Sequence, residues 1–176
     1  GFDFNGEMDR RGLPSVIAEH PTAKLACVQP DGRVSLAAAD MHFPNGSVVT
    51  PDGRTLIVAE TLARRLAAFD IGPDGALSNR RTWAGLGERT PDGICLDAEG
   101  AVWFANPGGT DCARVAEGGE VLEVIDTGQP CFACMLGGED GKSLFMLTAP
   151  WTPPGGGPTK GRILMAEVDA GHAGCP

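Results

Sequence analysis

Two short segments of this chain place an oxygen-bearing side chain between a proline and a glycine. Pro44-Asn45-Gly46 and Pro91-Asp92-Gly93 each lead into a β-prone run. Amide and carboxylate oxygens are the ligands that hard cations such as Ca²⁺ prefer, so Asn45 and Asp92 are candidate metal ligands. The ordinary alternative is a turn, because Asn-Gly and Asp-Gly are frequent turn pairs. The same tripeptide occurs at a plain hairpin, Pro51-Asp52-Gly53, which serves as an internal control.

The two candidates belong to a repeat. The leading prolines, Pro44, Pro91 and Pro130, are separated by 47 and 39 residues, within the range of β-propeller blades. Each is followed by a turn and an apolar strand. Blades are related by rotation about a central axis, so the oxygen-bearing residues of adjacent copies are expected to meet at the mouth of the channel. In the third copy we expect Cys131 at this position, a poor ligand for a hard cation.

The elements around these motifs predict an all-β fold. Short β-prone runs alternate with Asp-Gly and Glu-Gly turns, which is the pattern of a β-meander. No window of 11 or more residues keeps the hydrophobic period of a helix. We therefore predict a single domain over residues 1–176, a partial β-propeller of about three to three and a half blades. The predicted parts are the end of a preceding blade at 1–40, with outer strands at 24–28 and 33–37, and blades at 43–84, 90–125 and 130–168.

Composition excludes several classes of partner. The 176 residues carry a net charge of −9, and the 14 Lys and Arg form no basic block, so we expect no nucleic-acid partner. No apolar run approaches the roughly 20 residues that span a bilayer, and the first residues lack the layout of a signal peptide. We expect a soluble, cytoplasmic protein without a membrane partner.

The six cysteines are too sparse for a disulfide scaffold, and most lie in strand-like apolar runs. Cys131 and Cys134 form a C-x-x-C, which could be a redox pair or half of a zinc site. No second C-x-x-C and no paired histidines accompany it. We interpret the cysteines as reduced core residues.

The remaining polar residues are interpreted as structural rather than functional. The histidines have no Ser, Cys or Asp partner at a telling spacing and are interpreted as surface or loop residues: His20, His42 and His172. Glu60 and Asn106 end the second strands of adjacent blades and are interpreted as caps of the sheet edge. The Pro- and Gly-rich stretch 150–158 is interpreted as a surface loop, with a lid over the channel as the alternative.

Several motifs together match a known family in order and spacing. They are Phe43–Gly46, Leu66–Asp70, Leu77–Arg81, Pro91–Asp97 with Gly100 and Trp103, and Cys134 with Gly137-Gly138. In these motifs the chain resembles the C-terminal half of the senescence-marker-protein/gluconolactonase family, which includes regucalcin and bacterial sugar lactonases. The resemblance covers nearly the whole chain. It implies a six-bladed propeller, of which this chain holds the last three blades and part of the one before.

The resemblance also implies a metal site with Glu, Asn and Asp ligands. The Asn corresponds to Asn45 and the Asp to Asp92, which would also be the catalytic proton acceptor. The family's Glu, in a Gly-Glu-Gly-Pro context, and its substrate-contacting Arg-x-Asn segment have no counterpart here. The implied function is metal-dependent hydrolysis of sugar lactones or related cyclic esters, with Ca²⁺ first and Zn²⁺, Mg²⁺ or Mn²⁺ as alternatives. The implied ligand is a small lactone or sugar acid.

Two alternatives stay open beside this interpretation. A non-catalytic propeller remnant or binding module would keep the blades without a complete site. In addition, an isolated half-ring would expose blade faces and leave the channel open. We therefore expect either that the chain was cut from a longer one or that it closes its ring by self-association.

Overall fold

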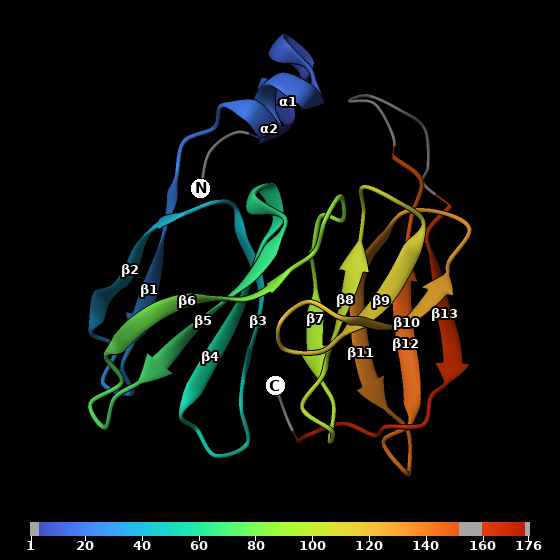
Figure 1. Ribbon diagram of the computed structural model, residues 1–176. Helices are drawn as coiled ribbons and strands as arrows, with labels where there is room; N and C mark the ends of the chain where they lie inside the picture. The colour runs from blue at the N-terminus through green and yellow to red at the C-terminus, as the bar shows by residue number, and fades with distance from the viewer. Residues whose placement is uncertain (1–3, 152–159, 175–176) are drawn as a thin grey trace.

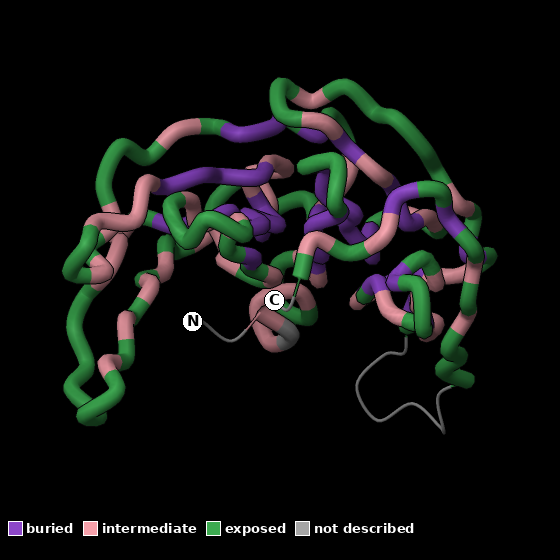
Figure 2. The backbone as a smooth tube through the Cα atoms, turned by 90° about the horizontal axis from the view of Figure 1, so that it is seen from below, coloured by how far each residue is buried: buried purple, intermediate pink, exposed green. Residues whose placement is uncertain are grey.

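The computed structural model describes residues 4–151 and 160–174 (Figure 1). Most of the stretch 150–158, predicted to be a surface loop or a lid, lies outside these residues. The strands form four antiparallel sheets in which neighbours along the chain are neighbours in the sheet. Seen from below in Figure 2, the sheets follow one another along an arc that is open on one side. This arrangement confirms the predicted class, a partial β-propeller.

Each sheet is a meander joined by tight turns. Gly53 (φ +70°) and Gly100 (φ +82°) adopt the left-handed conformation that such turns require. The first sheet contains β1 (Ala23–Val28) and β2 (Val34–Met41). The second contains β3 (Pro44–Val49), β4 (Thr55–Glu60), β5 (Arg65–Ile71) and β6 (Leu77–Gly85), with the 3-10 turn η1 (Thr61–Ala63) after β4. The third contains β7 (Ile94–Leu96), β8 (Val102–Asn106), β9 (Asp111–Val115) and β10 (Val121–Asp126), and the fourth β11 (Cys131–Gly137), β12 (Ser143–Thr148) and β13 (Arg162–Glu167).

Residues 4–18 depart from the prediction. They form two short helices, α1 (Phe4–Arg11) and α2 (Leu13–Ala18), rather than part of the preceding blade. Glu7 and Arg10 pair at 2.5 Å along α1, and a proline stands in the first turn of α2, where its missing N–H costs nothing. Helices of eight and six residues are too short to show a clear 3.6-residue period. No helix among the described residues is long and apolar enough to cross a membrane.

Alternate side chains of β8 enter two separate cores. Phe104 packs between the second and third sheets, Trp103 packs between the third and fourth, and both are fully buried. Successive side chains of a strand point to opposite faces, so a central blade buries both faces and its strand can be apolar throughout. Trp83 packs in the first of these cores. Both tryptophans therefore pack between blades.

Cysteines fill the core between the third and fourth sheets: Cys95, Cys112, Cys131 and Cys134. All four are buried and free of disulfides. A hydrogen bond with Cys112, together with burial, raises the pKa of the Cys134 thiol well above its usual value. Because the thiolate is the reactive form, these sulfurs act as core residues. The structural interpretation of the C-x-x-C is therefore the correct one.

Both ends of the arc expose apolar side chains. In the two-stranded sheet these are Val28, Val34 and Leu36. At the other end β13 pairs only with β12 among the described residues, and Ile163 and Met165 are exposed on it. Open edges of this kind can pair with a further strand.

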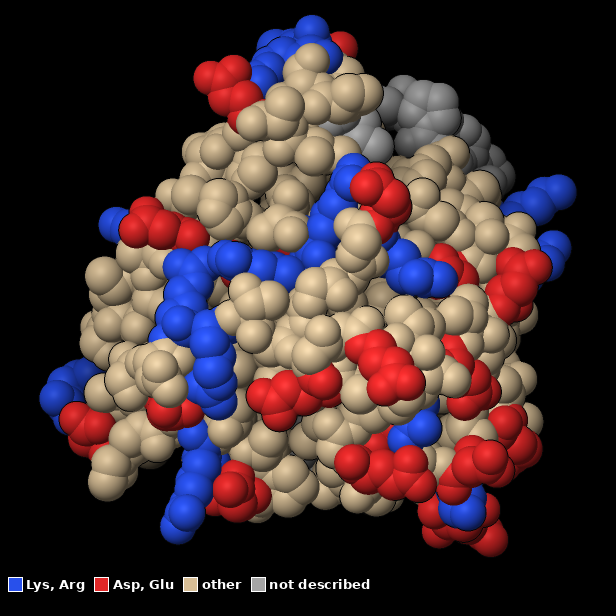
Figure 3. All heavy atoms as spheres, in the orientation of Figure 1, with Lys and Arg blue, Asp and Glu red and all other residues tan. Residues whose placement is uncertain are grey.

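The basic side chains gather over the second sheet, as Figure 3 shows. Arginines of that sheet bond to carboxylates rather than standing free. Arg65 and Arg80 contact Glu60 at 2.7 and 2.8 Å, and Arg81 contacts Asp70 at 2.6 Å. These arginines therefore stabilise the second sheet as members of ion pairs.

Candidate metal centre

The inner strands β3 and β7 bring the two predicted ligands together. Asn45 is the second residue of β3, and its side chain is exposed. Asp92 lies two residues before β7 and is half-buried. The Asn45 amide lies close enough to the Asp92 carboxylate to lower its pKa. The start of β3 lies at the end of the propeller that carries α1 and α2 in Figure 1.

The glycines that follow the two candidates serve close packing rather than turns. Neither Gly46 nor Gly93 has a positive φ. The Gly46 N–H donates to the Asp92 carbonyl oxygen at 3.0 Å, and the Gly93 N–H donates to the Phe132 carbonyl oxygen at 3.1 Å. A Cβ on Gly46 would lie 2.6 Å from the Asp92 oxygen, and one on Gly93 would lie 2.8 Å from the Cα of Ala133. The turn interpretation of these glycines is wrong, because they let adjacent inner strands touch.

Gly46→Ala is expected to lower the free energy of unfolding by about 1–3 kcal/mol, as overpacking does. The added methyl would clash with the backbone of Asp92 and Ile94, each with an atom 2.6 Å from the new Cβ. Urea denaturation measures the change. Gly85→Ala is the matched control, since a Cβ there meets nothing within 4 Å. Equal losses in the two variants would contradict the close approach of the blades.

Phe132, rather than Cys131, occupies the ligand position of the third copy. The Gly46 amide meets the carbonyl of Asp92, and in the next blade the Gly93 amide meets that of Phe132. Cys131 pairs with Thr148 at the end of β12 as Pro44 pairs with Glu60 at the end of β4, so Phe132 follows Cys131 as Asn45 follows Pro44. Cys131 instead turns into the core. An aromatic side chain therefore stands where the first two blades carry the candidate ligands Asn45 and Asp92.

Asp92 differs from Asp97, a fully buried carboxylate of the same blade. Asp97 accepts hydrogen bonds from Arg114 Nε at 2.6 Å and from the backbone of Glu99 and Ala101. Asp92 pairs with no Lys or Arg among the described residues. Burial raises the pKa of Asp92 to about 6, and the neighbouring Asn45 amide offsets part of this rise. A half-buried carboxylate without a positive partner is electrostatically suited to bind a cation.

A buried ion cluster holds the segment that leads into Asn45. Glu60 is fully buried and accepts hydrogen bonds from Arg65 Nε at 2.7 Å, Arg80 Nη2 at 2.8 Å and the His42 N–H at 2.9 Å. Burial opposes ionisation, but these bonds outweigh it and hold the pKa of Glu60 below its ordinary value. Glu60 therefore anchors the backbone just before Asn45. From the sequence, Glu60 is instead interpreted as a cap of the sheet edge.

The residues just before Pro44 also make contacts that the spacing did not indicate. His20 Nε2 lies 2.9 Å from His42 Nδ1, and the ring of Phe43 packs on Phe4 with centroids 5.1 Å apart. Phe43 has a φ of +59°, a strained conformation for a non-glycine residue that costs about 1–3 kcal/mol. The helical segment is thus tied to the mouth of the channel beside Asn45.

Thr61 is the residue of this site that sequence reasoning missed. It lies in η1 and contacts both ligand segments, the side chain of Asn45 and the backbone carbonyl of Pro91. A single threonine after a strand belongs to no sequence motif that would mark it as part of a site. The Asn45 and Pro91 contacts span 16 and 30 residues of chain, so only the folded blades reveal them.

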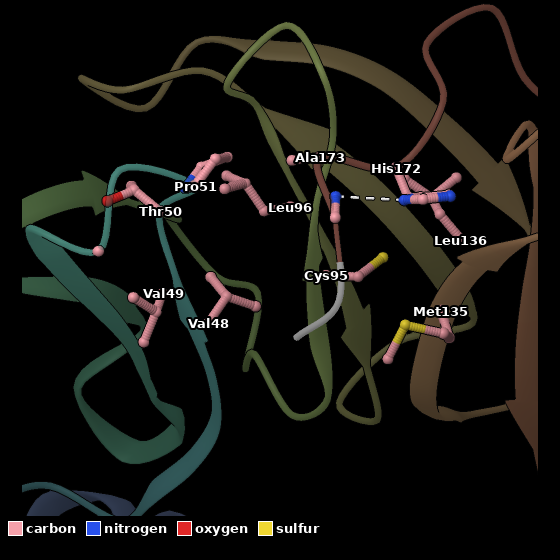
Figure 4. A pocket seen from close by; sticks show the side chains of 12 residues that line it. Val48, Val49, Thr50, Pro51, Cys95, Leu96, Met135, Leu136, His172 and Ala173 are labelled. Atoms are coloured by element: carbon pink, nitrogen blue, oxygen red, sulfur yellow. Dashed lines mark hydrogen bonds between the residues drawn. The ribbon is translucent and has the colours of Figure 1, made fainter.

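Two cavities mark the ends of the inner strands. One, of about 430 Å³, adjoins Asn45 between β1 and β3. The other, of about 390 Å³, lies at the opposite end of the strands and is lined mainly by apolar side chains such as Val48, Leu96 and Met135 (Figure 4). His172 lines this second cavity and accepts a hydrogen bond from the Gly174 N–H at 3.1 Å. Asn45 therefore lines the first cavity, and neither candidate ligand lines the second.

Comparison with known proteins decides the family. A family model described as the SMP-30/gluconolactonase/LRE-like region matches residues 4–150. The chain belongs to this family. The regucalcin of Danio rerio is 32% identical over 154 residues, which are 85% of this chain and 51% of that protein. Human regucalcin is 29% identical over the same shares.

Solved structures of the SMP-30/gluconolactonase/LRE-like family share the fold. A gluconolactonase from Xanthomonas campestris is 30% identical with a TM-score of 0.62, covering 81% of this chain and 44% of that one. A calcium-binding regucalcin from Agrobacterium tumefaciens has a TM-score of 0.69 at 20% identity, covering 85% of this chain and 53% of that one. The chain thus spans about half the length of the relatives it matches, in line with a partial regucalcin-like propeller.

Proposed function

We propose that this chain carries part of the metal site of a hydrolase that opens sugar lactones or related cyclic esters. One observation carries the proposal. The Asn45 amide and the half-buried Asp92 carboxylate, from adjacent inner strands, meet at one end of the propeller, and Asp92 has no Lys or Arg partner among the described residues. Membership of a family that contains gluconolactonases supports it.

The donor chemistry fits a hard divalent cation. Both candidate ligands present oxygen atoms, which suits Ca²⁺ better than the softer metals that thiolates attract. We propose Ca²⁺, with Mg²⁺, Mn²⁺ and Zn²⁺ as alternatives. Among the described residues no three His, Cys, Asp or Glu side chains are grouped to hold a metal. Asn45 and Asp92 would therefore supply two ligands of a larger set.

The residues of this chain would then act in distinct roles. A bound cation polarises an ester carbonyl and stabilises the negative charge that develops on it. With a pKa of about 6, the Asp92 carboxylate is ionised at neutral pH and able to accept a proton from an attacking water. The Asn45 amide beside that carboxylate favours its ionised form. The cavity beside Asn45 leaves room for a small ring.

Metal content and lactone hydrolysis test this proposal together. We expect elemental analysis to find a divalent cation in the purified chain or after its addition. Hydrolysis of a panel of sugar and aliphatic lactones is expected to stop on chelation and return with added Ca²⁺. Hydrolysis that persists without any divalent ion would refute the mechanism.

A binding module without catalysis is the second candidate. It is favoured by the small ligand set, since the described residues bring only Asn45 and Asp92 to the centre. This function predicts that the chain takes up a cation or a sugar acid but turns over no lactone. Calorimetric binding of gluconate alongside the hydrolysis assay separates the two functions.

We also propose that the open ends of the arc associate. Two copies of the chain meeting at β13 and at the β1–β2 sheet would cover Ile163, Met165 and Val34, which are exposed here. Size-exclusion chromatography with light scattering is expected to show a mass above that of the 18.2 kDa chain. A well-behaved monomer at that mass would defeat the proposal of self-association.

A further inference from the structure

The hydroxyl of Thr61 lies between the two ligand-bearing segments. Thr61 Oγ1 donates to the Pro91 carbonyl oxygen at 2.7 Å, and Asn45 Nδ2 donates to Thr61 Oγ1 at 3.4 Å. Thr61 is almost fully buried, with 9% of its surface exposed. One hydroxyl therefore links an inner strand of the second sheet to the residue just before Asp92.

The direction of these hydrogen bonds sets the orientation of the Asn45 amide. A hydroxyl has a single proton to donate, and the short bond to Pro91 uses it. Toward Asn45 the Thr61 oxygen can only accept, so it must face the NH₂ group of the amide. If the amide were flipped, two oxygens would face each other without a proton between them. The Asn45 Oδ1 is thereby turned away from Thr61.

We propose that Thr61 is a positioning residue for the cation site, orienting the Asn45 amide so that its oxygen is presented as a ligand and holding Asp92 at a set distance from it. This inference rests on the proposed metal-dependent function and assigns Thr61 no contact with the cation. A second cross-blade bond, from the Gly46 N–H to the Asp92 carbonyl at 3.0 Å, supports the same spacing. The two bonds hold the backbone on both sides of the Asp92 side chain.

The arrangement is specific to the pair of blades that carries the ligands. Thr61 follows Glu60, the last residue of β4. In the third sheet the residue after the end of β8 is Pro107, and in the fourth the residue after the end of β12 is Ala149. Neither has a hydroxyl. The bridging hydroxyl is therefore no general requirement of packing one blade on the next.

Titration with Ca²⁺ by calorimetry, on the whole chain, tests the inference without an activity assay. Thr61→Val keeps the shape of the side chain and removes the hydroxyl, and it is expected to weaken Ca²⁺ binding roughly tenfold to hundredfold, as loss of an outer hydrogen bond to a ligand does. Thr61→Ser restores the hydroxyl and is expected to bind within about twofold of wild type. Thr127→Val is the matched control.

Thr127 is also buried, and its Oγ1 donates to the Gln129 carbonyl at 2.8 Å in another blade. Its replacement removes a comparable bond and is expected to leave Ca²⁺ affinity unchanged. Wild-type affinity in Thr61→Val, or an equal loss in Thr127→Val, would overturn the positioning role.

NMR of the Asn45 side-chain amide in the metal-free chain supplies an independent readout. We expect Thr61→Val to shift the two amide protons and speed their exchange with water, and Thr61→Ser to restore them. Unchanged amide signals in Thr61→Val would overturn the inference. If the wild-type chain binds no cation, the proposed function fails, while the amide signals still decide whether Thr61 orients Asn45.

Discussion

Asp92→Ala is expected to reduce lactone hydrolysis by about 10³-fold, within the range of general acid–base contributions. The substitution removes the proposed proton acceptor and one of the two oxygen ligands. Its backbone contacts persist, since the Asp92 carbonyl still accepts the Gly46 N–H. We therefore expect the variant to fold while losing both turnover and Ca²⁺ affinity. Initial rates on the best lactone of the panel and calorimetry with Ca²⁺ measure the two losses.

Asp52→Ala is the matched control for this experiment. Asp52 stands in the same Pro-Asp-Gly tripeptide, but its Oδ1 accepts the Thr50 hydroxyl at 2.6 Å and the Arg54 N–H at 3.1 Å within an exposed turn. We expect this variant to retain wild-type hydrolysis and Ca²⁺ affinity. Turnover that survives the loss of Asp92, or that falls equally in both variants, would remove Asp92 from the mechanism.

Above pH 6, the metal-free Asp92→Asn variant is expected to be more stable than wild type, by up to about 3 kcal/mol. Burial raises the pKa of Asp92 from its ordinary 3.8 to about 6 in the folded chain. Between these values the folded state holds a proton that the unfolded state has released. The wild-type free energy of unfolding therefore falls as pH rises from about 4 to 6. The amide of the variant carries no charge and avoids this loss.

Urea denaturation at several pH values in the presence of a chelator measures this difference. The gap between the two proteins should open through the window from pH 4 to 6 and stay constant above it. Saturating Ca²⁺ is expected to close the gap by stabilising wild type alone. Asp52→Asn should show no gain at neutral pH, because the hydrogen bond from Thr50 lowers the pKa of Asp52. Parallel pH profiles for wild type and Asp92→Asn would show that Asp92 titrates normally.

The strands and the two ligand candidates were predictable because their signals are local. Asp-Gly turns between short apolar runs indicated the strands, and β3 to β6 run from Pro44 to Gly85 where a blade was predicted at 43–84. The repeat of proline, small polar residue and glycine indicated that Asn45 and Asp92 would lie together, and the Asn45 amide is close enough to Asp92 to lower its pKa. Both patterns act over a few residues, where composition and spacing decide the conformation.

The tertiary structure alone decided what surrounds the ligands. Strand pairing places Cys131 at the position of Pro44 and therefore Phe132 where Cys131 was expected, and an offset of one residue leaves no trace in the spacing of prolines. From the sequence, Gly46 is interpreted as a turn residue. In the structure a Cβ on Gly46 would lie 2.6 Å from the carbonyl oxygen of Asp92 in the next blade. The Thr61 hydroxyl reaches Pro91 across 30 residues of chain. The sequence by itself therefore determined the blades and the two candidate ligands, because those depend on neighbours along the chain. How the ligands are oriented and charged depends on contacts between blades, which exist only once the sheets pack.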